Sequence, residues 1–232
     1  NSDKALEFTG SSLVSLGCGL ASNSTSSTAV YLGGSTTVTA SGVSTAGDIY
    51  QGGSADVVTD GPMRTHSGEV DDPYGPTGRN LQAPASPKNC TEKKLRVMAN
   101  KALSPGRYCS GLDIQKGTAT LSPGVYIIDG GTLSVGAQAS LVGNDVTIIL
   151  TGSGTDYAGL DVNGNANISL HAPSSGTAYD GVVMFQDPNA PTFKGNKVIV
   201  NKLNGGADLS LTGAVYFPKQ GLDFRGGANA TV

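Results

Sequence analysis

Residues 111–121 read Gly-Leu-Asp-Ile-Gln-Lys-Gly-Thr-Ala-Thr-Leu, and two later stretches repeat the pattern. Residues 159–168 read Gly-Leu-Asp-Val-Asn-Gly-Asn-Ala-Asn-Ile, and residues 221–232 read Gly-Leu-Asp-Phe-Arg-Gly-Gly-Ala-Asn-Ala-Thr-Val. Each copy contains a glycine turn, a short apolar alternation, a second turn and another strand of small residues. A repeated strand–turn–strand unit is typical of a solenoid, in which each unit buries its apolar face against its neighbours.

The composition of the chain also favours short strands and tight turns. Of 232 residues, 34 are glycine, only 14% are charged and none is tryptophan. Glycine at roughly twice its usual share, with few charges, is typical of turn-rich β-structure. The net charge of −3 and the lack of a basic cluster argue against nucleic acid as a partner. No apolar run is long enough to span a membrane.

The spacing of the repeats predicts the length of a rung. Gly33-Gly34 and Gly52-Gly53 lie 19 residues apart, which suits one rung of a β-solenoid. The stretch Ala-Asn-Ile-Ser-Leu at 166–170 returns as Ala-Asp-Leu-Ser-Leu at 207–211, about two rungs later. We therefore predict an all-β fold, a right-handed parallel β-helix over residues 1–232, with a β-sandwich as the alternative. The abrupt ends of the sequence suggest a domain excised from a longer, anchored protein.

Residues 61–110 interrupt the repeats. The stretch from Gly61 to Pro87 is rich in proline and has no strand period, so it predicts a long loop. Residues 91–103 are good helix formers, and Thr91 could cap a helix of two to three turns. We expect residues 61–110 to form a loop and short-helix insertion on the β-helix.

The three cysteines suit an exported protein. Cys90 and Cys109 lie 19 apart, and a disulfide between them would fasten the loop. Such a bond persists in an oxidising compartment, which predicts an extracytoplasmic location in the periplasm or at the cell surface. Cys18 is either a buried thiol or the partner of a cysteine outside this sequence.

From residue 111 onward the repeats resemble a known family. The stretches that carry the likeness are Leu121-Ser-Pro-Gly-Val-Tyr-Ile-Ile-Asp-Gly-Gly131, Gly143-Asn-Asp-Val-Thr-Ile-Ile-Leu-Thr-Gly152, Gly181-Val-Val-Met-Phe-Gln-Asp187 and Leu211-Thr-Gly-Ala-Val-Tyr-Phe-Pro218. This series resembles the extracytoplasmic C-terminal region of TadG-like proteins, which accompany the Tad (Flp) pilus-assembly machinery of bacteria. The resemblance implies pilus or envelope proteins as partners, and a membrane anchor in a segment absent from this sequence.

Three aspartates share one place in the repeats. Asp113, Asp161 and Asp223 each follow Gly-Leu. Stacked in register they would form a ladder of carboxylates, which would need a cation. Because spacings of 48 and 62 residues do not ensure a shared face, we expect them to be scaffold residues at corners, where aspartate bonds its own backbone.

Other candidate sites are less regular. Glu69, Asp71 and Asp72 could hold a calcium ion in the long loop, although no repeating Asp-x-Asp pattern supports a calcium site. Threonines at 36, 37, 39, 118 and 120 could lie on a flat, ice-binding face, but no such row recurs rung after rung. No catalytic serine motif, phosphate loop or dinucleotide fingerprint is present in the sequence.

These observations together predict a non-catalytic protein. We expect an exported structural or adhesive domain associated with a bacterial Tad-type pilus or cell surface, with other envelope proteins or surface glycans as partners. Two alternatives remain open: a carbohydrate-binding or carbohydrate-active β-helix protein, and an ice-binding solenoid. We expect the loop in 61–110 to be a cap of the solenoid or its partner site, because variable function often resides on loops.

Overall fold

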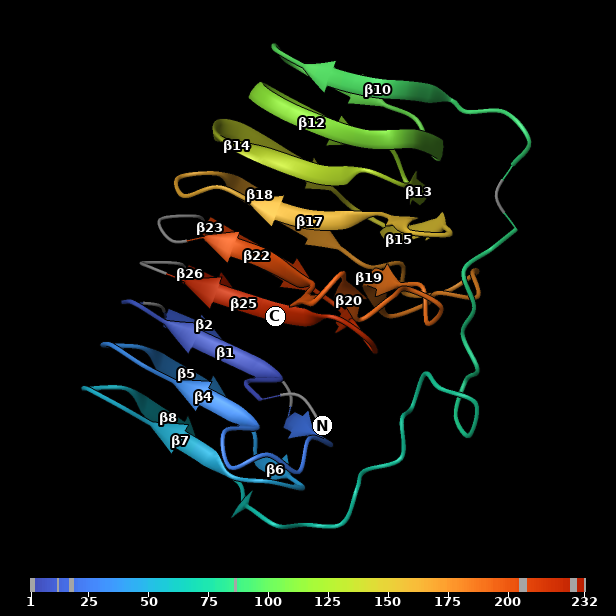
Figure 1. Cartoon of the computed structure of the whole chain (residues 1–232). Helices are drawn as coiled ribbons and strands as arrows, with labels where there is room; N and C mark the ends of the chain where they lie inside the picture. Colours follow the sequence, from blue (N-terminus) through green and yellow to red (C-terminus); the bar gives the residue numbers. More distant parts are fainter. Residues whose placement is uncertain are drawn as a thin grey trace.

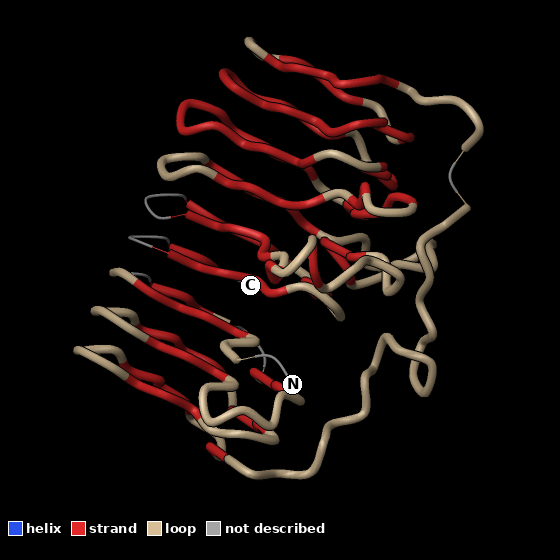
Figure 2. Tube along the Cα trace, viewed as in Figure 1, coloured by secondary structure: helices blue, strands red, loops and turns tan. Residues whose placement is uncertain are grey.

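The chain winds into a parallel β-helix, in which the strands of successive rungs stack in register (Figure 1). The computed structural model describes residues 3–11, 13–16, 19–85, 87–204, 208–225 and 229–231. Within these residues every regular element is a strand, as Figure 2 shows. The parallel β-helix predicted from the repeats is therefore confirmed.

Each rung contributes strands to up to three faces. The first face stacks, in spatial order, β10 (Glu92–Val97), β12 (Gly106–Leu121), β14 (Thr132–Gly143), β17 (Gly159–Val162), β22 (Val200–Asn204), β25 (Gly221–Arg225), β1 (Leu6–Thr9), β4 (Val30–Leu32) and β7 (Ile49–Gln51). The second face stacks β11 (Lys101–Leu103), the later parts of β12 and β14, β18 (Asn167–His171), β23 (Asp208–Thr212), β26 (Asn229–Thr231), β2 (Leu13–Ser15), β5 (Thr37–Ala40) and β8 (Asp56–Thr59).

The third face is divided into two stretches. Its upper stretch stacks the start of β12 with β13 (Gly124–Asp129), β15 (Val146–Ser153), β19 (Val182–Gln186) and β24 (Ala214–Tyr216). Its lower stretch stacks β3 (Leu20–Ser22), β6 (Val43–Thr45) and β9 (Met63–Arg64). Two short antiparallel pairings stand apart from this stack: β16 (Asp156–Tyr157) pairs with β15, and β20 (Phe193–Lys194) pairs with β21 (Lys197–Val198).

The order of the rungs in space differs from their order along the chain. The stack begins at β10 and descends to β25 and β26, and β1 and β2 then pair beneath those two strands (Figure 1). Residues 3–64, the N-terminal unit, form the lower rungs, and residues 92–231, the C-terminal unit, form the upper ones. Residues 65–91, the strap, run along the outside from the bottom of the stack to its top (Figure 1).

The rung length read from the glycine pairs is confirmed. Val30 of β4 pairs with Ile49 of β7, and Val38 of β5 pairs with Val57 of β8, 19 positions later in each case. The turns stack as closely as the strands, because a Cβ on Gly53 would lie 2.7 Å from the carbonyl oxygen of Gly34.

The core is a set of stacked apolar columns. Along a strand, inward residues alternate with outward ones, so Leu112 and Ile114 are buried on either side of Asp113. One core cluster extends from Val97 in β10 to Val57 in β8 and therefore crosses the junction between the two units. Burial of each large aliphatic side chain contributes about 1.5–3 kcal/mol to stability.

The strap covers the outer side of the upper stretch of the third face. Leu81 is buried with Ile149 and Phe185, and Tyr74 packs against the same cluster. Most residues of β15 and β19 are consequently buried on both sides of the sheet. Burial on both sides explains why β15 begins with an unbroken run of apolar residues and threonine rather than an alternation.

The helix predicted at residues 91–103 is wrong. This segment forms β10 and β11, which pair with β12. Lys94 has a φ of 49° at a shift of register, which breaks the period of two in the sequence. The insertion is thus the strap alone, and the rungs resume at Glu92 rather than at residue 111.

The long loop and its disulfide are confirmed. In the described part of residues 65–91 no strand or helix occurs. Cys90 at the end of the strap is bonded to Cys109 in β12, with their Cα atoms 5.8 Å apart. Arg107 reinforces this joint, because its guanidinium pairs with Asp129 at 2.7 Å and donates to the carbonyl oxygen of Pro87 at 2.8 Å. Cys18 lies outside the described residues.

Candidate binding face

The structure places the three repeated aspartates in one column of the first face. Ser134 is the register partner of Asp113 on one side and of Asp161 on the other. Lys202 is in the same way the register partner of both Asp161 and Asp223. We call the whole register line the axial column. From top to bottom it consists of Arg96, Asp113, Ser134, Asp161, Lys202, Asp223, Glu7, Tyr31 and Tyr50.

The corner position predicted for these aspartates is wrong. Asp113, Asp161 and Asp223 lie within β12, β17 and β25. In the first repeat the corner is formed by the glycine, since Gly111 has a φ of 97° where β12 turns. The aspartate two residues later therefore belongs to the strand. The shared face is real, and serine or lysine separates the carboxylates.

Neighbouring opposite charges balance the upper part of the axial column. The guanidinium Nε of Arg96 donates to a carboxylate oxygen of Asp113 at 3.0 Å, and the other oxygen accepts from Gln115 at 2.6 Å. Lys202 lies between Asp161 and Asp223 on adjacent strands. Adjacent strands are about 4.8 Å apart. The alternation removes the repulsion of an uninterrupted carboxylate ladder.

The lower end of the axial column is aromatic. The rings of Tyr31 and Tyr50 stack with their centroids 4.9 Å apart and their planes 7° from parallel. The ammonium of Lys4 lies 3.8 Å from the centroid of Tyr31 and forms an ion pair of 2.7 Å with Glu7. Tyr50 is 46% exposed on the last rung. This end presents a flat aromatic surface beside a charged pair.

Three depressions follow the axial column and share lining residues. The first, of about 780 Å³, contains Arg96, Asp113 and Ser134 in its wall. The second, of about 370 Å³, shares Asp161 with the first and reaches Lys202. Together these two depressions run along the first face across several rungs.

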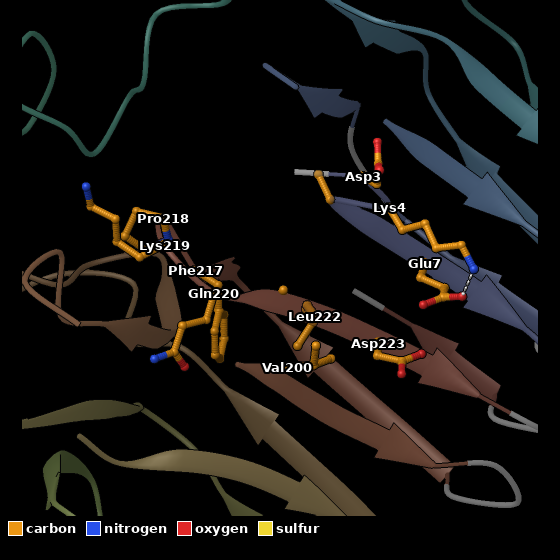
Figure 3. A pocket seen from close by; sticks show the side chains of 12 residues that line it. Asp3, Lys4, Glu7, Val200, Phe217, Pro218, Lys219, Gln220, Leu222 and Asp223 are labelled. Atoms are coloured by element: carbon orange, nitrogen blue, oxygen red, sulfur yellow. Dashed lines mark hydrogen bonds and ion pairs between the residues drawn. The ribbon is translucent and has the colours of Figure 1, made fainter. Parts of the chain in front are cut away.

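The third depression crosses the junction between the N-terminal and C-terminal units. It measures about 270 Å³ and shares Val200 with the second depression. Figure 3 shows Lys4 and Glu7 on one side of it, with Asp223 on the neighbouring strand. Residues from opposite ends of the sequence thus form one surface.

The calcium candidates of the strap have other contacts. Asp72 accepts hydrogen bonds from the hydroxyl of Tyr216 at 2.6 Å and from the backbone N–H of Tyr74 at 2.9 Å. Glu69 and Asp71 are exposed on the same segment. Over the residues that the structure describes, no group of three or more His, Cys, Asp or Glu side chains gathers to hold a metal ion.

The threonines lie on the second face but do not form a regular row. Thr120 has Val142 as its register partner on the next rung, and Ser169 follows. Thr37 and Thr39 lie several rungs lower, in β5. The outward positions of this face therefore carry mixed small residues, and Thr36 is buried in a turn.

A buried amide network inside the β-helix is structural. The side chain of Asn201 accepts from the N–H of Leu160 at 2.8 Å and donates to Gln220 at 3.2 Å. Gln220 also accepts from Gln186 at 2.8 Å and donates to the carbonyl oxygen of Pro191. Buried polar groups need such partners to offset the loss of hydration. The network is hydrogen-bonded within the core and serves to hold the rungs together.

Sequence reasoning found only the three aspartates of the axial column and missed Arg96, Ser134, Lys202 and the whole lower end. Glu7, Tyr31 and Tyr50 were not among the predicted site residues. The sequence does contain a signal for Glu7. The segment Leu6-Glu7-Phe8 is similar to Leu222-Asp223-Phe224, the segment with which it pairs. Phe8 and Phe224 follow Glu7 and Asp223 in the sequence, and their buried rings stack with the centroids 5.3 Å apart.

Comparisons with known protein families, curated proteins and solved structures find no match to this chain. Among the described residues there is also no helix long and apolar enough to cross a membrane.

Proposed function

We propose that the chain is a non-catalytic, exported adhesive domain that binds an extended glycan along the axial column. The observation that carries the proposal is the continuity of this column. It passes from Arg96 through Lys202 to Tyr50 without a break at the junction between the two units. A linear polymer lying along such a face would meet an exposed or half-buried polar side chain at each rung except that of Asp223, which is buried.

The chemistry of the column favours a glycan over other polymers. Carboxylates, a serine hydroxyl and cations alternate at adjacent strands, so a chain of hydroxyl groups finds both acceptors and donors. The stacked rings of Tyr31 and Tyr50 offer an apolar face with a polar edge, which suits the C–H face of a sugar ring. Because Arg96 pairs with Asp113, Lys4 pairs with Glu7, and Lys202 lies between two carboxylates in the register, we expect a neutral or weakly charged glycan.

Two observations support an exported setting. The Cys90–Cys109 disulfide is of the kind that persists outside the reducing cytosol. The resemblance of the upper rungs to TadG-like proteins supports a place at a bacterial pilus or cell surface. An adhesive role fits both, since a rigid β-helix presents its binding surface without the conformational cost of ordering a loop.

The test is titration calorimetry of the whole chain with neutral oligosaccharides of increasing length. Affinity should rise with length, because longer chains reach more rungs. Lys202→Ala and Tyr31→Ala should each weaken binding of the longest oligosaccharide, whereas the control Thr120→Ala, exposed on the second face, should not. Equal affinity for short and long oligosaccharides, or no binding at all, would contradict the proposal.

A carbohydrate-active enzyme is the second candidate, and one observation favours it. Glu7 and Asp223 are register partners on adjacent strands. Glycosidases use two carboxylates that flank the scissile bond. Incubation with the same oligosaccharides and assay of new reducing ends decides between the two. Release of reducing ends that is lost in Glu7→Gln would establish catalysis.

A further inference from the structure

The junction between the two units is held by strand pairing and side-chain packing. Leu6–Thr9 of β1 pairs with Leu222–Arg225 of β25, and Leu13–Ser15 of β2 pairs with Asn229–Thr231 of β26. The covalent connection between the units is the strap, which runs on the outside (Figure 1). The N-terminal unit is therefore a docked segment rather than the next turn of a continuous coil.

The docking is incomplete on the third face. Among the described residues, strand pairs cross the junction on the first and second faces, but no pair joins β24 to β3. A cavity of about 700 Å³ lies there instead, with Phe8, Phe224 and Leu222 in its mainly apolar wall. Tyr74 of the strap also lines it. This junction is thus closed by strand pairing on two of its three faces.

The two parts of the strap are fastened to different units. Its first part follows the N-terminal unit, because Val70 exchanges hydrogen bonds of 2.8 and 2.9 Å with the side chain of Asn23. Its later part follows the C-terminal unit. Asp72 bonds to Tyr216, and the guanidinium of Arg79 donates to the carbonyl oxygens of Ala178 and Asp180, both at 2.8 Å.

The change of attachment lies between Val70 and Asp72. A hinge in this short stretch would let the N-terminal unit swing without loss of the strap's hydrogen bonds to either unit. Short hinges between docked segments favour exchange of those segments between copies.

We propose that residues 3–64 of one copy of this chain dock on β25 and β26 of a second copy, so that the protein self-associates by segment exchange. The exchanged junction contains the same strand pairs and the same Phe8–Phe224 stack as the closed chain. Exchange therefore requires no new interface. Because each rung interacts chiefly with its neighbours, the rest of the β-helix is unchanged.

Cysteine cross-linking across the junction tests the proposal. Glu7 and Asp223 are register partners on parallel strands, about 4.8 Å apart, which is within the range of a disulfide. In a Cys18→Ser background, one full-length chain carries Glu7→Cys and another, with a size tag, carries Asp223→Cys. The two are mixed in mild denaturant, diluted and oxidised. Segment exchange predicts a covalent heterodimer on a non-reducing gel.

Two controls decide how the result is interpreted. Ser134→Cys and Asp161→Cys are register partners inside the C-terminal unit, and their mixture should give several-fold less heterodimer. A single chain with both Glu7→Cys and Asp223→Cys should form an intrachain bond in its closed form and an interchain bond in its exchanged form. The proposal is overturned if this intrachain bond forms without heterodimer in the mixture. It is also overturned if the double-cysteine chain forms this bond neither within nor between chains, or if both mixtures give equal heterodimer.

Discussion

The hydroxyl of Tyr216 in β24 donates a hydrogen bond of 2.6 Å to the carboxylate of Asp72 in the strap. Burial and the neighbouring carboxylate both raise the pKa of Tyr216, so the hydroxyl stays protonated and able to donate. The ring of Tyr74 packs edge-on against the same tyrosine. This contact joins the strap to the third face next to the junction between the two units.

We predict that Tyr216→Phe loosens the strap without unfolding the β-helix. A hydrogen bond to a charged group is worth about 1.5–3 kcal/mol, and partial exposure places this one at the lower end. Trypsin should cleave after Arg79 several-fold faster in the variant, as followed by mass spectrometry. Tyr50→Phe, on the exposed last rung, is the matched control. Equal cleavage of the variant and the unmodified chain would show that this bond does not hold the strap.

We predict that stability falls at alkaline pH through buried tyrosines. Burial raises the pKa of Tyr126 to about 12, and its hydroxyl donates to the carbonyl oxygens of Leu103 and Ser122, both at 2.8 Å. In the unfolded chain a tyrosine ionises near pH 10. The stabilisation is therefore complete below pH 10 and is lost as the pH rises toward 12.

Urea titrations at a series of pH values measure this effect. The free energy of unfolding should be flat from pH 8 to 9.5 and should then decrease. In Tyr126→Phe the decrease should be smaller, because one titrating group is gone, although the variant is less stable at neutral pH by about 1–2 kcal/mol. An identical alkaline slope in the two proteins would refute the assignment to Tyr126.

We predict that removal of the Cys90–Cys109 disulfide destabilises the top of the β-helix. The bond spans 19 residues. A loop of that size corresponds to about 3 kcal/mol in the chain-entropy model. The double variant Cys90→Ser, Cys109→Ser should unfold at a lower urea concentration, and hydrogen exchange in β10 should accelerate most. Faster exchange in β7 or β8 instead would contradict this local effect.

We predict that Gly34→Ala is strongly destabilising. Gly34 has a φ of 77°, and a Cβ there would lie 2.3 Å from the carbonyl oxygen of Gly10 on the neighbouring rung. A left-handed conformation alone costs an alanine about 1–2 kcal/mol, and the clash adds to it. Gly68→Ala is the control, because a Cβ added there would meet no other segment within 4 Å. A similar thermal midpoint for both variants would disprove the stacked-turn argument.

The rung pattern was predictable from the sequence because it is a local property. Inward residues such as Leu112 and Ile114 alternate with outward ones, and the pairs Gly33-Gly34 and Gly52-Gly53 are one rung apart. The disulfide followed from spacing and composition. Residues 91–103 were misassigned because their helix propensity is overridden by pairing with β12, and the bulge at Lys94 conceals the alternation.

The order of the rungs and the axial column were harder to predict. Which rung stacks on which depends on contacts between distant segments, as in the pairing of Phe8 with Phe224. The spacing of Asp113, Asp161 and Asp223 could not place them on one face, because the intervening rungs differ in length. The pairing of the strands places Ser134 and Lys202 between the aspartates and so joins the three into one column.

The position of β1 beneath β25 also affects how the protein is made. During synthesis the N-terminal unit emerges first, but the strands on which it docks are nearly the last of these residues to leave the ribosome. Folding that depends on such distant contacts is slow. Until β25 and β26 arrive, Phe8 and the edge of β1 remain uncovered, so the new chain is exposed to aggregation for nearly the whole time that this stretch is being synthesised.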